Sequence, residues 1–170
     1  MERSFKKEVQ SLRLGDGETF HGEGILAVTK GLLQSGVSYV GGYQGAPISH
    51  LMDVLADAQG ILDELGVHLE TCANEAGAAA MLGASINYPL RGAVTWKATV
   101  GTNVASDALS NLASAGVKGG ALIVVGEDYG EGASIIQERS HAFAMKSQIW
   151  LLDPRPNLTT IVDMVEQGFQ

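Results

Sequence analysis

The sequence contains a single cysteine and no cluster of positive charge. Cys72 stands alone among 170 residues, which excludes a disulfide framework and a Cys-x-x-Cys metal or iron–sulfur site within this chain. We interpret Cys72 as a small apolar thiol in a strand. Lys and Arg number 11 against 19 Asp and Glu, and the net charge of −8 argues against nucleic acid as a partner.

Long apolar runs are also missing. No stretch of about 18 consecutive apolar residues occurs, and the polar start at residues 1–4 lacks the apolar core of a signal peptide. We therefore expect a cytoplasmic protein without a membrane partner. Hydrophobic residues make up 45% of the 170 positions, which is enough for one globular domain with a sizeable core.

Short apolar segments alternate along the chain with segments of helical spacing, and many of the 22 glycines stand at the junctions. This pattern is typical of repeated strand–helix units. The predicted strands are 38–42, 68–73, 92–97, 121–127 and 149–153, and the predicted helices are 25–33, 51–65, 76–85, 104–112 and 161–169. Residues 121–125 are continuously apolar, which favours a parallel strand covered on both faces. The sequence thus predicts an α/β fold, a doubly wound and mainly parallel sheet with helices on both faces, flavodoxin-like in outline.

The two ends of the chain carry weaker signals. Residues 1–20 have no strong pattern, and we predict an N-terminal arm there, followed by the domain proper at 21–170. Near the other end, a turn at 154–157 leads to an amphipathic helix that stops at Gln170 with no return strand. We expect a fragment or a truncated product that ends before the last strand of its domain.

The most informative position is Glu75. It follows a predicted strand and precedes residues 76–85, which are nearly free of bulky side chains. Ligands of open α/β sheets bind beyond the carboxyl ends of the strands, and small residues let a flat cofactor or another backbone come close. Glu75 is therefore the leading candidate for a working acid. In the structural alternative, Asn74 caps the helix and Glu75 complements its dipole, within a catalytically silent module that binds a nucleotide or a partner protein.

Four segments occur in an order that points to a known family. They are GGYQGAPIS at 41–49, ANEAGAA at 73–79, GTNVASD at 101–107 and GGALIVVGED at 119–128. Their order and spacing resemble the N-terminal, pyrimidine-binding domain of thiamine-diphosphate-dependent 2-oxoacid:ferredoxin oxidoreductases. Within that family the resemblance is greatest to members that act on indolepyruvate, and it runs from about His21 to Gln170.

For Glu75, the resemblance implies a hydrogen bond to a ring nitrogen of the cofactor's aminopyrimidine. A carboxylic acid that shares a proton with this nitrogen favours the imino tautomer of the ring. The basic nitrogen of that tautomer then removes the thiazolium proton of the cofactor. Glu75 is accordingly the predicted catalytic residue, and a glutamine could not replace it.

The loop 43–49 follows the first predicted strand, where the family carries a Tyr-Pro-x-Thr-Pro-Ser type motif beside the substrate. Ala46 stands where a threonine is expected, so one hydroxyl contact to a 2-oxoacid is missing. The resemblance implies cofactor contacts from Tyr43 and Pro47 and substrate contacts from Gln44 and Ser49. The alternative is a plain turn that launches a helix with Pro47 at its first position.

The segment after the third predicted strand resembles the family's Lys-His-x-Gly-x-Asn. The resemblance implies cofactor contacts from Gly101 and Asn103 and a substrate contact from Lys97. This chain has one residue more between Lys97 and Gly101 than that pattern, and no histidine follows the lysine. Arg139, in a looser match, would contact the substrate carboxylate or a partner subunit. The structural alternative makes Asn103 a cap and the two cations solvated surface residues.

Gly15-Asp16-Gly17 looks like the start of the motif that holds magnesium and diphosphate in these enzymes. No apolar strand precedes it and no asparagine pair follows at the required distance, so we interpret it as a turn with no metal ligands. We therefore expect this chain to bind only the pyrimidine half of thiamine diphosphate. Magnesium and the iron–sulfur clusters would be bound elsewhere in the intact enzyme.

The resemblance also implies partners and a reaction. The partners are a second thiamine-binding domain or subunit, a smaller oxidoreductase subunit and ferredoxin, in a homodimer or larger oligomer. The reaction is the oxidative decarboxylation of an aryl 2-oxoacid such as indolepyruvate, or of another 2-oxoacid, to the acyl-CoA with reduction of ferredoxin. The isolated chain should be inactive.

Overall fold

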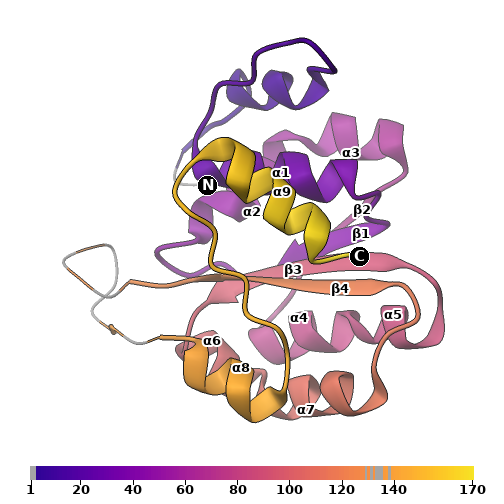
Figure 1. Cartoon of the computed structure of the whole chain (residues 1–170), viewed down its shortest axis with the longest axis vertical. Helices are drawn as coiled ribbons and strands as arrows, with labels where there is room; N and C mark the ends of the chain where they lie inside the picture. Colours follow the sequence, from indigo (N-terminus) through magenta and orange to yellow (C-terminus); the bar gives the residue numbers. More distant parts are fainter. Residues whose placement is uncertain (1–2, 129, 131, 133–135, 138) are drawn as a thin grey trace.

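A computed structural model describes residues 3–128, 130, 132, 136–137 and 139–170. At its centre these residues form a sheet of four parallel strands in the order β2-β1-β3-β4 (Figure 1). The strands are β1 Tyr39–Gly42, β2 His68–Thr71, β3 Arg91–Lys97 and β4 Gly120–Gly126. Gly42 lies opposite Thr71 on one side and Thr95 on the other. Because all the strands run the same way, their carboxyl ends meet at one edge of the sheet.

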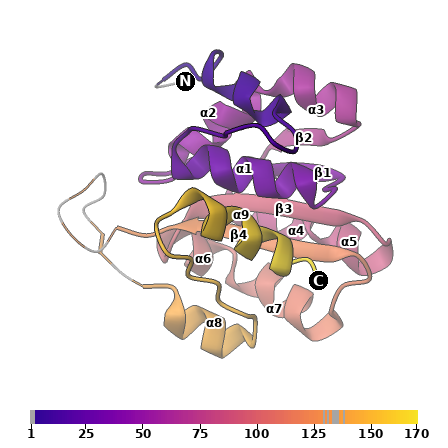
Figure 2. The ribbon, with the colours of Figure 1, turned by 45° about the horizontal axis from the view of Figure 1, so that its top comes forward.

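Helices cover both faces of the sheet (Figures 1 and 2). One face carries α1 Gly24–Gln34, α2 Ser49–Asp57, α3 Gln59–Leu65 and α9 Leu158–Gln167. The other carries α4 Glu75–Met81, α5 Gly83–Asn87, α6 Val100–Val104 and α7 Ser106–Ala115, with α8 His141–Ser147 beside α7. The predicted doubly wound α/β fold is confirmed. Within the described residues, no helix combines the length and apolar character needed to cross a membrane.

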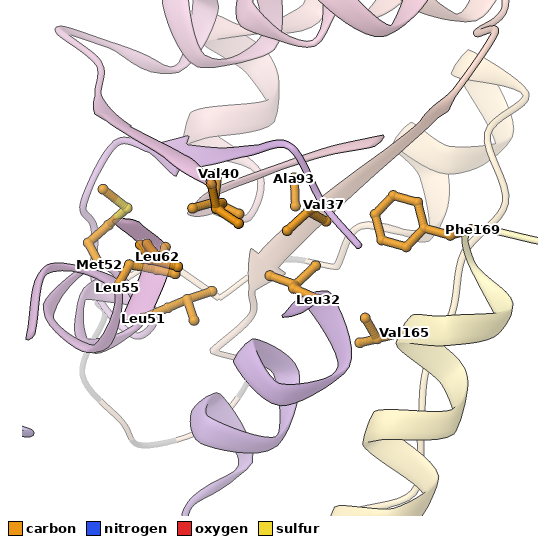
Figure 3. Packing of buried hydrophobic residues seen from close by; sticks show 11 residues of the cluster. Leu32, Val37, Val40, Leu51, Met52, Leu55, Leu62, Ala93, Val165 and Phe169 are labelled. Carbon is orange, nitrogen blue, oxygen red and sulfur yellow. The ribbon is translucent and has the colours of Figure 1, made fainter. Parts of the chain in front are cut away.

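The sheet has a core layer on each face, and successive side chains of β3 point alternately into one layer and the other. Val94 and the fully buried Trp96 pack on the α4 to α7 side, whereas Ala93 packs on the α1, α2 and α9 side. Figure 3 shows the second of these layers, where Phe169 at the end of α9 approaches Val37 and Leu32. This alternation is expected of a parallel strand that is covered on both faces, since successive side chains point in opposite directions.

The prediction of a strand at 149–153 was wrong. This segment runs past β4 without joining the sheet, and both line a cavity of about 630 Å³. Trp150 is 84% exposed and Leu151 is 40% exposed, whereas the side chain of Leu152 lies near Gly168 and Leu122. Apolar side chains favour a strand only where the backbone finds a ladder partner. Here the segment is held by side-chain packing against the end of α9 instead.

Two predicted helices are interrupted. The helix expected over 51–65 is α2 followed by α3, and the carbonyl of Ala58 between them accepts hydrogen bonds from the amides of both Ile61 and Leu62. The helix expected over 76–85 is α4 followed by α5, which meet at the fully buried Leu82.

Residues 3–20 pack against the helices of the first face. A 3-10 helix, η1 Glu8–Arg13, presents Val9 and Leu12 to the core, and Phe5 is fully buried beside them. They join a cluster with residues of α1, α2 and α3. The carboxylate of Asp57 accepts a hydrogen bond of 2.5 Å from the backbone N–H of Phe5. The boundary placed at residue 20 stays a prediction.

Asp57→Ala is expected to lower the free energy of unfolding by about 0.5–1.5 kcal/mol, because the amide of Phe5 would lose its acceptor in a partly buried setting. Chemical denaturation measures the change. The matched control is Glu64→Ala, which removes the exposed ion pair that joins Arg13 to α3 and should leave stability nearly unchanged. A larger loss for Glu64→Ala than for Asp57→Ala would contradict this account.

Candidate functional site

The carboxyl edge of the sheet brings together segments that are far apart in the sequence. The loop after β1 lies against the end of β3, because a Cβ atom at Gly45 would be 3.0 Å from the Cβ of Lys97. The end of β3 is bonded to the end of β4, with the amide of Ala98 donating to the carbonyl of Gly126 at 2.9 Å. Two of the four segments that carry the family resemblance, 41–49 and 119–128, therefore meet beside the end of β3.

Glu75 is the first residue of α4 and is largely buried. Asn74 precedes it in an extended conformation and caps the helix, because its side chain accepts a 2.8 Å hydrogen bond from the amide of Gly77. Glu75 is only 8% exposed, and in the described part of the chain its carboxyl makes neither an ion pair nor a side-chain hydrogen bond. The capping interpretation holds for Asn74, and Glu75 stands in the first turn of α4 as a largely buried acid whose carboxyl is available to a ligand.

The absence of a side chain at Gly101 leaves the space that Glu75 occupies. A Cβ atom at Gly101 would lie 2.5 Å from Cδ1 of Trp96 and 3.0 Å from Cγ of Glu75. Trp96 is fixed in turn, since it is fully buried and its Nε1–H donates to Oγ1 of Thr102 at 3.1 Å. The indole, the glycine backbone and the acid are thus stacked in van der Waals contact. Only glycine allows α6 to approach the acid so closely.

A tight turn accommodates the extra residue between Lys97 and Gly101. Thr99 has φ 59° and ψ −67°, and the turn is closed by a 2.8 Å hydrogen bond from the amide of Val100 to the carbonyl of Ala98. This is a γ-turn of the strained kind, occupied here by a β-branched residue. Thr99 is 7% exposed, and its hydroxyl has no hydrogen-bond partner among the described residues. Sequence reasoning missed Thr99, although the extra residue in this segment was a signal.

Lys97, which is predicted to contact the substrate, lies on the opposite side of the sheet from Glu75. Lys97 is half-buried and points away from the neighbouring Trp96, towards the loop after β1. Tyr43 is half-buried, with its amide bonded to the carbonyl of Thr95 at 3.0 Å. Gln44 is exposed at this edge. The structure therefore separates Lys97 from Glu75 by the thickness of the sheet.

The remaining predicted residues lie at or near the surface. Pro47 is exposed and precedes α2 by two residues, so it is not the first residue of a helix, whereas Ser49 begins α2 and is half-buried. Asn103 is exposed inside α6 and is not its cap, because the helix begins at Val100. Arg139 is also exposed, in the segment before α8. The structure does not bring these residues into contact with Glu75.

Cys72 lies one residue beyond β2, not within a strand as predicted. Its amide donates to the carbonyl of Gly42 at 2.9 Å, which extends the pairing of β1 and β2 by one bond. Burial raises the pKa of the Cys72 thiol, and the negative charge of Glu70 raises it further. The thiol is therefore a weak nucleophile at neutral pH, in keeping with a packing role.

The edge around Glu75 suits a flat heteroaromatic ring with nitrogen atoms at its rim. A buried carboxyl can bond a ring nitrogen, and the Thr99 hydroxyl has an unused hydrogen-bonding capacity. The described residues include no group of three or more His, Cys, Asp and Glu side chains that could hold a metal ion. The buried carboxyl of Glu75 is the feature that fits an aminopyrimidine ring.

No protein-family model matches the chain. Curated proteins with the name indolepyruvate oxidoreductase subunit IorA, in contrast, are similar to it in sequence. The protein from Pyrococcus abyssi is 29% identical over 147 residues, which cover 86% of this chain and 22% of that protein. The protein from Thermococcus kodakarensis is 30% identical over 128 residues, or 75% of this chain and 19% of that protein. The protein from Methanothermobacter marburgensis is 27% identical over 159 residues, or 94% of this chain and 25% of that protein.

The chain is similar in sequence to the IorA subunits over most of its own length. The resemblance predicted from the four segments is thereby confirmed. Its IorA relatives are oxidoreductase subunits by name, and the chain spans about a fifth to a quarter of their length. What the name of the relatives says about indolepyruvate applies to those proteins.

Proposed function

We propose that this chain provides the pyrimidine-binding half of a thiamine diphosphate site in an oxidoreductase for an aryl 2-oxoacid. The reaction is the oxidative decarboxylation of indolepyruvate, or of a similar aryl substrate, to the acyl-CoA with reduction of ferredoxin. The observation that carries the proposal is Glu75, a buried acid with no ion pair in the described residues, at the ligand-binding edge of a relative of IorA.

Thiamine diphosphate, when bound, supplies a thiazolium ring that stabilises negative charge on the carbon of the former carbonyl group. The task of Glu75 is to hold a proton at a carboxyl oxygen and share it with a pyrimidine nitrogen. Burial keeps water away from this proton, which strengthens the hydrogen bond. Gly101 packs against the side chain of Glu75 and is itself packed against Trp96, so these two residues restrict the position of the acid.

Most of the other residues that the resemblance singles out are proposed to face the substrate. Lys97 would attract the carboxylate of a 2-oxoacid, with Gln44 and Ser49 as hydrogen-bond donors near it. Tyr43 would border the cofactor. Arg139 would bind a carboxylate or a partner subunit. Because Lys97 and Glu75 leave the sheet on different faces, a ligand that reaches both must bridge the edge of the sheet.

The other half of the site lies outside this chain in our proposal. A second thiamine-binding domain or subunit would hold the diphosphate and magnesium, and a smaller subunit with iron–sulfur clusters would pass electrons to ferredoxin. The catalytically silent module remains the competing function. It tolerates a surface ion pair at Glu75, whereas the catalytic function needs the unpaired and buried acid described above.

Titration calorimetry with thiamine diphosphate and magnesium tests the proposal. We expect no measurable binding to this chain alone and tight binding when the companion thiamine-binding domain or subunit is present. The companion alone should bind more weakly than the pair, because it lacks the contacts to the pyrimidine. Equal affinity with and without this chain would reject the proposed function and favour the silent module.

A further inference from the structure

We propose that Thr99 is a further ligand-binding residue of this site, whose hydroxyl bonds the group that binds beside Glu75. The inference rests on the proposed function and extends it to a residue outside the four segments' predicted contacts. Three independent features of Thr99 support it: an unsatisfied hydroxyl, a strained backbone and its place in the chain.

The first feature is the hydroxyl itself. Oγ1 of Thr99 is buried and has no hydrogen-bond partner among the described residues. Buried polar atoms are almost always bonded in folded proteins, so an exception calls for a functional reason. The hydroxyl of Ser140 is the other such atom in the described chain, but it lies beyond β4 and lines the cavity beside that strand. Only Thr99 stands in the segment that contacts Glu75.

The second feature is backbone strain at the same residue. Thr99 adopts φ 59° and ψ −67°, a conformation that a β-branched residue rarely takes. A single hydrogen bond closes the turn around Thr99, from the amide of Val100 to the carbonyl of Ala98 at 2.8 Å. Strain of this kind persists only where the surroundings impose it, and it concentrates at ligand-binding sites. A glycine would hold this turn without strain, so the turn alone does not explain a threonine.

The third feature is the distance along the chain to Glu75. Thr99 is two residues before Gly101, so their Cα atoms are at most about 7 Å apart. Gly101 is in turn packed against Cγ of Glu75. The first turn of α6 fixes this spacing, because the amide of Asn103 donates to the carbonyl of Thr99 at 2.7 Å. Thr99 and Glu75 are thus both placed through Gly101, which is why we assign to Thr99 the same ligand as to Glu75.

The chemistry of a threonine hydroxyl suits an aminopyrimidine. The hydroxyl can accept a hydrogen bond from an exocyclic amino group or donate one to a ring nitrogen. In the free protein the hydroxyl is covered, so the ligand must uncover it by rotating the side chain or by relaxing the turn. Release of the positive φ angle would offset part of that cost. The unsatisfied hydroxyl and the positive φ angle of Thr99 thus disfavour the free protein, and a hydrogen bond to the ligand would favour the bound one.

The test compares Thr99→Val with Thr99→Ser in the protein as it assembles with the domain or subunit that completes the site. Valine has the shape of threonine without the hydroxyl. We expect Thr99→Val to raise the melting temperature of the ligand-free protein, because a buried unsatisfied group is removed. We expect the same variant to weaken binding of thiamine diphosphate with magnesium by about 2- to 10-fold, the equivalent of one net hydrogen bond. Thr99→Ser should keep the affinity of the wild type.

The two readouts move in opposite directions, which a purely structural threonine would not produce. A higher melting temperature with unchanged affinity in Thr99→Val would overturn the inference, since the hydroxyl would then serve no ligand. A lower melting temperature would overturn it as well, because the hydroxyl would have a partner in the free protein. Glu75→Gln is titrated in parallel. Lost binding in Glu75→Gln with normal binding in Thr99→Val rejects only the role of Thr99, whereas no binding by the wild type rejects the proposed function and this inference together.

Discussion

Glu75→Gln is expected to lower turnover of the complete oxidoreductase by about 10²- to 10⁴-fold, the usual contribution of a positioned acid or base. Glutamine keeps the shape of the side chain but cannot share a proton with a pyrimidine nitrogen. In the described part of the chain Glu75 has no ion pair to lose, so the fold and the melting temperature should stay close to those of the wild type. The measurement is the steady-state rate of ferredoxin reduction with indolepyruvate and coenzyme A.

Glu70→Gln is the matched control. Glu70 is an exposed acid in β2, five residues before Glu75, and its carboxylate lies 3.3 Å from Nε2 of His68. It lies outside the stack of Trp96, Gly101 and Glu75, so its replacement should leave turnover unchanged. If Glu75→Gln keeps more than about a tenth of wild-type turnover, the catalytic role is wrong. An equal loss in both variants would point to a general effect of charge at this edge.

The architecture of the chain could be predicted because its local and long-range signals agree. The apolar run of β4 indicated a strand covered on both faces, and the structure places core clusters on each side of it. Gly66 and Gly116 directly follow the last residues of α3 and α7, and both adopt a positive φ angle there. The segment 149–153 has a similar composition to β4 but forms no strand. Strand formation depends on a partner backbone, which composition does not encode.

The same limit applies to the site. The position of Glu75 could be predicted because the carboxyl ends of parallel strands share one edge, whatever the details of packing. Thr99 could not, because the observation that singles it out is a backbone conformation, φ 59° and ψ −67°, that its residue type does not favour. The sequence also did not show on which face of the sheet each predicted site residue lies. Lys97 and Glu75 both belong to the same edge in sequence terms, and only the alternation of side chains along β3 shows that they face different sides.

Gly101→Ala should have the second largest effect, on both stability and cofactor binding. The new methyl group would lie 2.5 Å from Cδ1 of Trp96, which is too close for any real contact. Trp96 is fully buried and bonded to Thr102, so it cannot move aside. The remaining ways to relieve the clash are a shift of α6 or displacement of Glu75. We expect a loss of about 1–3 kcal/mol in the free energy of unfolding, as for other overpacked cores.

Gly60→Ala separates this clash from the ordinary effect of glycine in a helix. Gly60 lies within α3, and a Cβ atom there would meet nothing within 4 Å. Alanine should therefore stabilise that helix by about 0.5–1 kcal/mol. Denaturation curves and calorimetric titration with thiamine diphosphate and magnesium are recorded for both variants, with the completing domain or subunit present. Because misplacement of a catalytic group by about 1 Å costs up to about 100-fold in function, affinity should fall in Gly101→Ala even at temperatures where the variant is fully folded. A folded Gly101→Ala protein with normal affinity would show that Glu75 does not depend on the close approach of α6.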